Sequence, residues 1–174
     1  MSRWRALLLF VAYIGTVWAA NWAIGRFGVV PVGFGLMAPA GVYFAGLAFT
    51  LRDLLHESAG SRRVIVAILI GAALSAFLEN GERIALASAV AFLLSESLDM
   101  VVYSPLRHRR WLLAVVLSNI VGLVVDSVVF LWLAFGSLAF LPGQLVGKAL
   151  TTLGAVVLLA AWRNRALLSR HPSF

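Results

Sequence analysis

Two carboxylates lie inside an otherwise apolar stretch of the chain. The segment FLLSESLDMVVYSPLRHRRW, residues 92–111, carries Glu96 and Asp99 among bulky apolar residues and ends in a basic cluster. A spacing of three residues puts both acids on one face of a helix. Acids inside an apolar helix are costly and mark functional sites, because they need polar partners in an interior or a water-filled cavity.

The cost of these acids can be compared with the apolar gain of their own helix. Nine Leu, Ile, Val and Phe residues in 84–102 favour membrane insertion by about 0.3–0.6 kcal/mol each, and each central acid costs about 2.5–3.5 kcal/mol. The two terms nearly cancel. We therefore expect Glu96 and Asp99 to face a polar interior.

The polar partners are expected on the last two apolar segments. Asn119 and Asp126 lie seven residues apart in SNIVGLVVDS, and Gln144 and Lys148 lie four apart in GQLVGKALTT, so each pair shares a helix face. A rise of about 1.5 Å per residue across a core of about 30 Å places all these groups with Glu96 in one central layer. The alternative is a structural ion pair with polar packing contacts.

A further polar stripe is predicted in residues 39–57. Tyr43, Thr50 and Asp53 share one helix face, with Asp53 toward the cytoplasmic end. The preceding residues 26–41, RFGVVPVGFGLMAPAG, are rich in Gly and Pro and predict an irregular, turn-forming loop. That loop is either a lid over the polar layer or a plain connector.

The elements that hold these residues follow from composition. Of 174 residues, 62% are hydrophobic and 12% charged, which is far more apolar than a soluble domain and predicts an integral membrane protein. The absence of cysteine excludes disulfides and thiolate metal sites, and no cofactor is expected. The net charge of +7 comes from arginines between apolar runs, so we expect a lipid bilayer and no nucleic acid as partner.

The fold class predicted is all-α, a polytopic membrane protein whose residues 1–174 form one domain. Eleven Lys and Arg residues fall on one side of the predicted spans and two on the other, which predicts that both termini lie in the cytoplasm. We expect a multi-pass protein of the inner membrane. In the alternative, the N-terminal run is a cleaved secretory signal. The six predicted spans are 6–24, 39–57, 64–78, 84–103, 111–135 and 138–162.

Several of these segments resemble a known family. AGLAFTLRDLLHESAGSRR, SESLDMVVYSPLR, SNIVGLVVDSVVFLWLAF and GQLVGKALTT are similar to the VUT family of vitamin uptake or queuosine precursor transporters, over residues 35–155. The resemblance implies a six-helix fold similar to the substrate-binding subunits of energy-coupling-factor transporters, and import of flat, ring-bearing nutrients, with deazaguanine bases as the family's assigned substrates. It also implies these pocket residues: Asp53, Glu96, Asp99, Asn119, Asp126 and Lys148.

The residue chemistry fits such a substrate. A guanine-like edge offers a ring N–H beside an amino group, which one carboxylate can accept in a bidentate pair, while Asn, Gln or Lys donates to the carbonyl. Glu96 is the first choice for this carboxylate. An aromatic platform for the ring is also expected, although each of the candidates is equally explained by core packing or an interfacial belt. These candidates are Trp22, Tyr43, Phe44 and Tyr103.

Other function classes are less well supported. GQLVGKALTT is one residue short of a phosphate-binding loop and lacks its Ser or Thr, so no ATP hydrolysis is expected from this chain. Transport would then run by diffusion, by proton coupling through the acids, or with a partner ATPase module. A second copy of the chain is a further candidate partner. The three His residues share no ligand spacing, which disfavours an enzyme. A non-transporting sensor or assembly protein is the remaining class.

Overall fold

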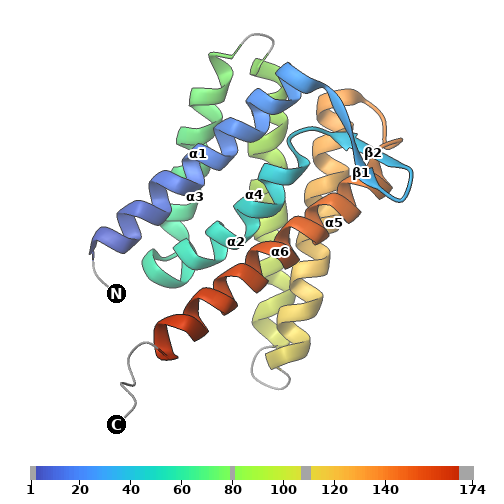
Figure 1. Ribbon diagram of the computed structural model, residues 1–174. Coiled ribbons are helices and arrows are strands. Elements are labelled where there is room, and N and C mark those ends of the chain that lie inside the picture. Colours follow the sequence, from blue (N-terminus) through green and yellow to red (C-terminus); the bar gives the residue numbers. More distant parts are fainter. Residues whose placement is uncertain (1–2, 79–80, 107–110, 169–174) are drawn as a thin grey trace.

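The computed structural model describes residues 3–78, 81–106 and 111–168, and in these ranges the chain folds as a helical bundle with one β-hairpin (Figure 1). The elements are α1 (Arg3–Phe27), β1 (Val29–Gly33), β2 (Leu36–Pro39), α2 (Val42–Ala59), α3 (Ser61–Ala76), α4 (Gly81–Leu106), α5 (Trp111–Phe135) and α6 (Leu141–Leu168).

Each predicted span overlaps one helix. α1 and α4 extend beyond the predicted runs at both ends, α5 has the predicted bounds, and α2, α3 and α6 are shifted along the chain by a few residues, as is usual for helix ends. Two helical stretches in the described ranges, Arg3–Phe27 and Leu117–Phe135, are long and apolar enough to cross a membrane by length and composition. The basic residues Arg107, Arg109, Arg110 and Arg170, which contribute to the predicted orientation, lie outside the described residues.

The loop before α2 differs from the irregular connector predicted from its Gly and Pro content. β1 and β2 pair antiparallel, with Val29 opposite Pro39 and Gly33 opposite Leu36. Phe34 and Gly35 both have positive φ, 53° and 72°, as the two central residues of a type I′ hairpin turn require. The glycines therefore serve the turn of an ordered hairpin.

The hairpin packs tightly on the start of α6. A Cβ added at Gly143 would lie 2.0 Å from the carbonyl oxygen of Met37, and one at Gly147 would lie 2.8 Å from a methyl of Val42. Val32, Ala38 and Val42 form a small buried cluster at this contact. The two glycines of α6 thus allow the hairpin to cover that end of the bundle.

The helices run back and forth between two ends of the bundle. α4 and α5 lie side by side, and the start of α1, the α2–α3 turn and the end of α6 lie away from the hairpin (Figure 1). One residue, Gly60 with φ of 81°, connects α2 to α3. Buried apolar residues around Tyr13, Phe49 and Phe92 form the larger core cluster.

Candidate functional site

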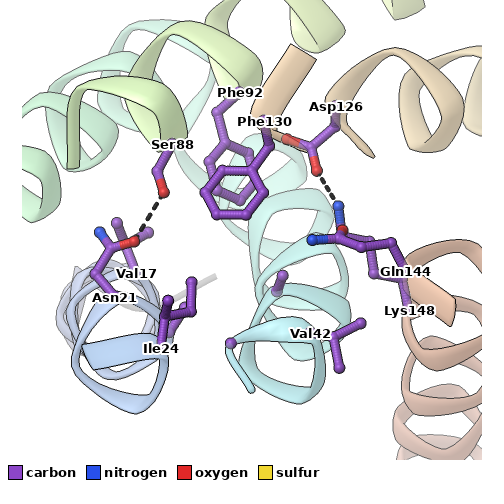
Figure 2. A pocket seen from close by; sticks show the side chains of 13 residues that line it. Val17, Asn21, Ile24, Val42, Ser88, Phe92, Asp126, Phe130, Gln144 and Lys148 are labelled. Atoms are coloured by element: carbon purple, nitrogen blue, oxygen red, sulfur yellow. Dashed lines mark hydrogen bonds and ion pairs between the residues drawn. The ribbon is translucent and has the colours of Figure 1, made fainter. Parts of the chain in front are cut away.

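A small cavity lies within the bundle close to the hairpin end. Its volume is about 30 Å³, which is room for about two water molecules. Figure 2 shows the polar side chains arranged on two sides of it. The side chains lining the cavity come from α1, the start of α2, α4, α5 and α6, and the residues are Val17, Ala20, Asn21, Ile24, Gly41, Val42, Ala45, Ser88, Phe92, Asp126, Phe130, Gln144 and Lys148.

One side of the cavity is a buried ion pair. The ammonium of Lys148 on α6 contacts the carboxylate of Asp126 on α5, and their side chains are 2% and 5% exposed. Lys148 Nζ also donates to Ser127 Oγ at 3.0 Å. Two opposite charges in contact balance each other, and several hydrogen bonds are needed to offset their removal from water. The wall formed by α5 and α6 is therefore polar but neutral overall.

The opposite side of the cavity is an amide. Ser88 on α4 donates from Oγ to Oδ1 of Asn21 on α1 at 2.8 Å. Asn21 Nδ2 and Gln144 Oε1 are buried and have no hydrogen-bond partner among the described residues. A buried polar atom without a partner costs about 1–3 kcal/mol. The two amides thus present unused hydrogen-bonding capacity at the cavity.

Two phenylalanine rings separate these polar sides. Figure 2 shows Phe92 and Phe130 between the Asn21–Ser88 pair and the Asp126–Lys148 pair. Both rings are buried, at 6% and 7% exposure. The cavity therefore combines apolar ring faces with polar groups at its two edges, which is the usual composition of a small-molecule site.

The structure brings three of the predicted site residues together. Asp126, Gln144 and Lys148 all line the cavity. The helical spacing in SNIVGLVVDS and GQLVGKALTT had placed them at a similar depth on neighbouring helices. Their meeting follows from the short α5–α6 connection, which makes the two helices antiparallel neighbours.

Glu96, the first choice for the substrate carboxylate, does not line this cavity. It lies eight residues further along α4 than Ser88, which is about 12 Å along a helix. Its Oε2 lies 2.8 Å from Nη1 of Arg52 on α2. The charge count had placed Arg52 on the cytoplasmic side, but the residue is 4% exposed and points into the bundle, where it pairs with Glu96. The polar groups predicted to form one layer therefore form two separate groups.

The remaining predicted site residues lie outside the cavity. Asp53 is exposed and accepts two hydrogen bonds from Arg52. Asp99 is half-buried, with Oδ1 3.7 Å from the position of a Cβ added at Gly122 on α5. Asn119 is exposed on α5. Tyr43 is 45% exposed, and its hydroxyl donates to the carbonyl of Pro31 at 2.7 Å, so it fixes the hairpin to α2.

The predicted aromatic platforms differ from the rings that line the cavity. Trp22 is 40% exposed and stacks on Trp18 outside the cavity. Phe44 is half-buried and is not among the lining residues. Tyr103 lies in α4, at a position where only the backbone is described.

Sequence reasoning missed the contribution of α1 and the start of α4. Between Arg5 and Arg26, Asn21 is the one amide or charged residue of α1, and that isolation was an available signal. Ser88, Phe92 and Phe130 carry no such signal, since small hydroxyls and phenylalanines are common throughout apolar helices. Two small residues of α1 also face inward, since Thr16 is buried in the bundle and Ala20 lines the cavity.

Comparison with known proteins gives one result. The sequence pattern of a family described as "putative vitamin uptake transporter" matches residues 72–163, just over half of the chain. The matched stretch contains α4, α5 and most of α6, and therefore Asp126, Gln144 and Lys148. Searches of curated proteins and of solved structures find no match.

Proposed function

Because the chain belongs to this family of vitamin uptake transporters, which are not enzymes, we propose that it is a multi-pass carrier of the inner membrane, with both termini in the cytoplasm, that imports a deazaguanine precursor of queuosine. The single observation that carries the proposal is the cavity within the bundle. It has a hydrogen-bond donor at one edge, an acceptor and an ion pair at the other edge, and two phenylalanine rings between them.

The unpaired amide atoms favour a ligand that hydrogen-bonds along its edges. Asn21 Nδ2 and Gln144 Oε1 have no partner among the described residues, and each lowers stability until something fills its position. A flat heterocycle with a carbonyl on one side and N–H groups on the other complements both atoms. Because Oδ1 of Asn21 already accepts from Ser88, Nδ2 is the atom of that amide that can donate to a ligand carbonyl.

Asp126 replaces Glu96 as the proposed substrate carboxylate. Its Oδ2 is engaged by Lys148, while a carboxylate has about four lone-pair sites in total. A ring N–H and a neighbouring amino group can therefore be accepted while the Lys148 contact is kept. The proposed site residues are Asp126, Lys148, Gln144 and Asn21, with Phe92 and Phe130 against the ring faces.

The size of the cavity supports a transport cycle with more than one conformation. A volume of about 30 Å³ is far below the 300–1,000 Å³ typical of small-molecule pockets. A bicyclic base therefore enters only if the helices or the two phenylalanine rings move apart. In the proposed cycle the pocket opens alternately to the two sides of the membrane, and this structure is a closed state.

The proposal is tested by a matched pair of asparagine substitutions. Asn21→Ala removes the unpaired donor at the cavity, whereas Asn119→Ala changes an exposed asparagine of α5 outside it. Loss of one hydrogen bond, about 0.5–1.5 kcal/mol, is expected to weaken binding of a radiolabelled deazaguanine base roughly three- to tenfold in Asn21→Ala and not in Asn119→Ala. Equilibrium binding to the purified protein measures this.

Uptake assays separate the remaining possibilities. We expect cells that neither make nor import the base to accumulate it when they express this protein. Uptake in cells but not in vesicles containing the purified protein alone would identify a subunit that depends on a partner ATPase, similar to energy-coupling-factor substrate-binding subunits. If the purified protein fails to bind the base, the substrate assignment is wrong. If Asn119→Ala, rather than Asn21→Ala, loses binding, the site lies at the predicted Glu96–Asp99 face instead.

A further inference from the structure

A second buried polar group lies between α2 and α4, further from the hairpin than the cavity. We call Arg52, Asp53, His56 and Glu96 the inner cluster. Arg52 donates from Nε and Nη2 to Asp53 Oδ1 at 3.0 and 2.7 Å, and its Nη1 lies 2.8 Å from Glu96 Oε2. His56 Nδ1 lies 3.6 Å from the other carboxylate oxygen, Glu96 Oε1. One guanidinium thus holds two carboxylates.

The inner cluster has room for one more positive charge. Arg52 contributes one positive charge, and Asp53 and Glu96 contribute one negative charge each, so with neutral His56 the cluster carries an excess negative charge. Asp53 has a side chain that is 55% exposed, whereas the side chain of Glu96 is 10% exposed. Arg52 gives two hydrogen bonds to Asp53, whereas Glu96 Oε2 is buried close to Nη1 without a well-aligned hydrogen bond.

Other titratable groups around Glu96 do not supply that charge. The phenol of Tyr13 on α1 interacts electrostatically with Glu96, and Asp99 follows one turn later on α4, so both are neutral or negative. On α3, Arg62 and Arg63 are exposed in the first turn. On α5, Asp126 is already paired with Lys148. A proton is the cation that is small enough to balance Glu96 in place.

A path for this proton leads from Glu96 to the α2–α3 turn. His56 is adjacent to Glu96 through Nδ1, and its Nε2 lies 2.9 Å from the hydroxyl oxygen of Ser61, the first residue of α3. The side chain of His56 is 43% exposed. The Nδ1–Oε1 distance of 3.6 Å exceeds a hydrogen bond, so transfer needs a small side-chain shift or one bridging water.

The inner cluster is also in contact with the cavity residues. The ring of Phe49 on α2 has the guanidinium carbon of Arg52 5.3 Å from its centroid and Lys148 Nζ 5.9 Å from it. Phe49 also contacts Phe92, with ring centroids 5.9 Å apart. A movement of Phe92 or Lys148 when a ring enters the cavity is therefore transmitted to Arg52, which holds Glu96.

We propose that the inner cluster is a proton-coupling site, with Glu96 as the proton carrier and His56 and Ser61 as its connection to water, so that import of the heterocycle is driven by proton influx. This inference rests on the proposed function. In the outward-open state Glu96 takes one proton from external water. On release, Glu96 Oε1 gives that proton to His56 Nδ1, the imidazole gives its Nε2 proton through the Ser61 hydroxyl to internal water, and Glu96 becomes a carboxylate facing Arg52 again. A flip of the neutral ring resets the relay.

Protonation can be measured without any substrate. In purified protein in lipid, infrared titration is expected to show a carboxylic acid band that is absent from Glu96→Gln and present in the control Glu57→Gln, which changes an exposed acid next to His56 in the sequence. His56→Asn is expected to slow hydrogen exchange of this band at least tenfold. If the titrating bands of Glu96→Gln match those of the unmodified protein, Glu96 is not the proton carrier and the inference is wrong.

Coupling is measured in vesicles with a radiolabelled deazaguanine base. Accumulation driven by an imposed pH gradient is expected to fall at least tenfold in Glu96→Gln, while exchange of labelled for unlabelled base, which needs no net proton movement, continues. Accumulation by Glu96→Gln equal to that of the unmodified protein overturns the coupling role. Failure of the unmodified protein to exchange the base counts against the proposed substrate, and the infrared titration then decides on the proton site alone.

Discussion

The ammonium of Lys148 has oxygen partners on a neighbouring helix and an aromatic ring beside it. Asp126 and Ser127 accept from it, and the ring of Phe49 lies below it. These contacts explain how an apolar helix such as α6 carries a cation that is 1% exposed.

Replacing Lys148 alone is therefore expected to be strongly destabilising. Lys148→Met leaves the Asp126 carboxylate buried without its counter-ion, which lowers the free energy of unfolding by about 3–5 kcal/mol. The double variant Lys148→Met with Asp126→Leu removes both charges and is expected to regain most of that loss. Equilibrium unfolding in detergent micelles is measured for the unmodified protein, for Lys148→Met and Asp126→Leu alone, and for the double variant.

Two results would argue against this pairing. If Lys148→Met alone kept the original stability, Asp126 would have to be neutral or hydrated in the folded protein. If the double variant were as unstable as the sum of its single variants, the two side chains would act independently of each other.

The contact between α2 and α6 depends on a single glycine. A Cβ added at Gly46 would lie 2.7 Å from Thr151 Cβ and 2.8 Å from the carbonyl oxygen of Lys148. In the same region Thr152 donates to the carbonyl of Gly46 at 3.0 Å. The two helices are therefore in backbone contact at the residue that holds the ion pair, which is the packing that small residues allow in membrane helices.

Gly46→Ala is expected to push α6 away from α2. Overpacking of this kind costs about 1–3 kcal/mol, and the displacement of Lys148 is expected to weaken ligand binding as well. Gly154→Ala is the matched control, because its added Cβ has nothing within 4 Å and Ala is favoured over Gly in a helix by about 1 kcal/mol. Unfolding and binding assays on both variants measure the difference. Equal behaviour of the two variants would mean that α2 and α6 are not in close contact.

The molecule as a whole stacks two polar groups along one bundle. The cavity lies near the hairpin, and the inner cluster lies toward the α2–α3 turn. Phe49 and Phe92 lie between them. In the proposed orientation, with both chain ends in the cytoplasm, the cavity is nearer the outer surface and the inner cluster nearer the cytoplasm, which suits import of a solute with proton release inside.

This topology can be tested directly because the chain has no cysteine. Phe34→Cys places a thiol at the hairpin tip, where the native side chain is 86% exposed, and Glu57→Cys places one at the exposed end of α2. A membrane-impermeant maleimide added to intact cells is expected to label the first and to label the second only after permeabilisation. The reverse pattern would invert the proposed orientation.

The sequence by itself determined the approximate positions of the helices. Apolar runs of membrane-spanning length define helix positions because backbone hydrogen bonds inside such runs must be satisfied locally. Helical periodicity also placed the acids and Lys148 in one layer, but it left both Asp126 and the Glu96–Asp99 pair open as partners of Lys148. In the same way the family resemblance followed from residues of α2, α4, α5 and α6.

Only the tertiary structure decided which distant residues meet. The rotation of each helix about its axis is set by packing contacts such as Gly71 against Val17 and Gly46 against α6, and these are not local. That rotation turned Arg52 inward to Glu96 and brought Asn21 to the cavity. It also left Asn119 exposed, although Asn119 lies seven residues before the buried Asp126, a spacing that places both on one face of a helix.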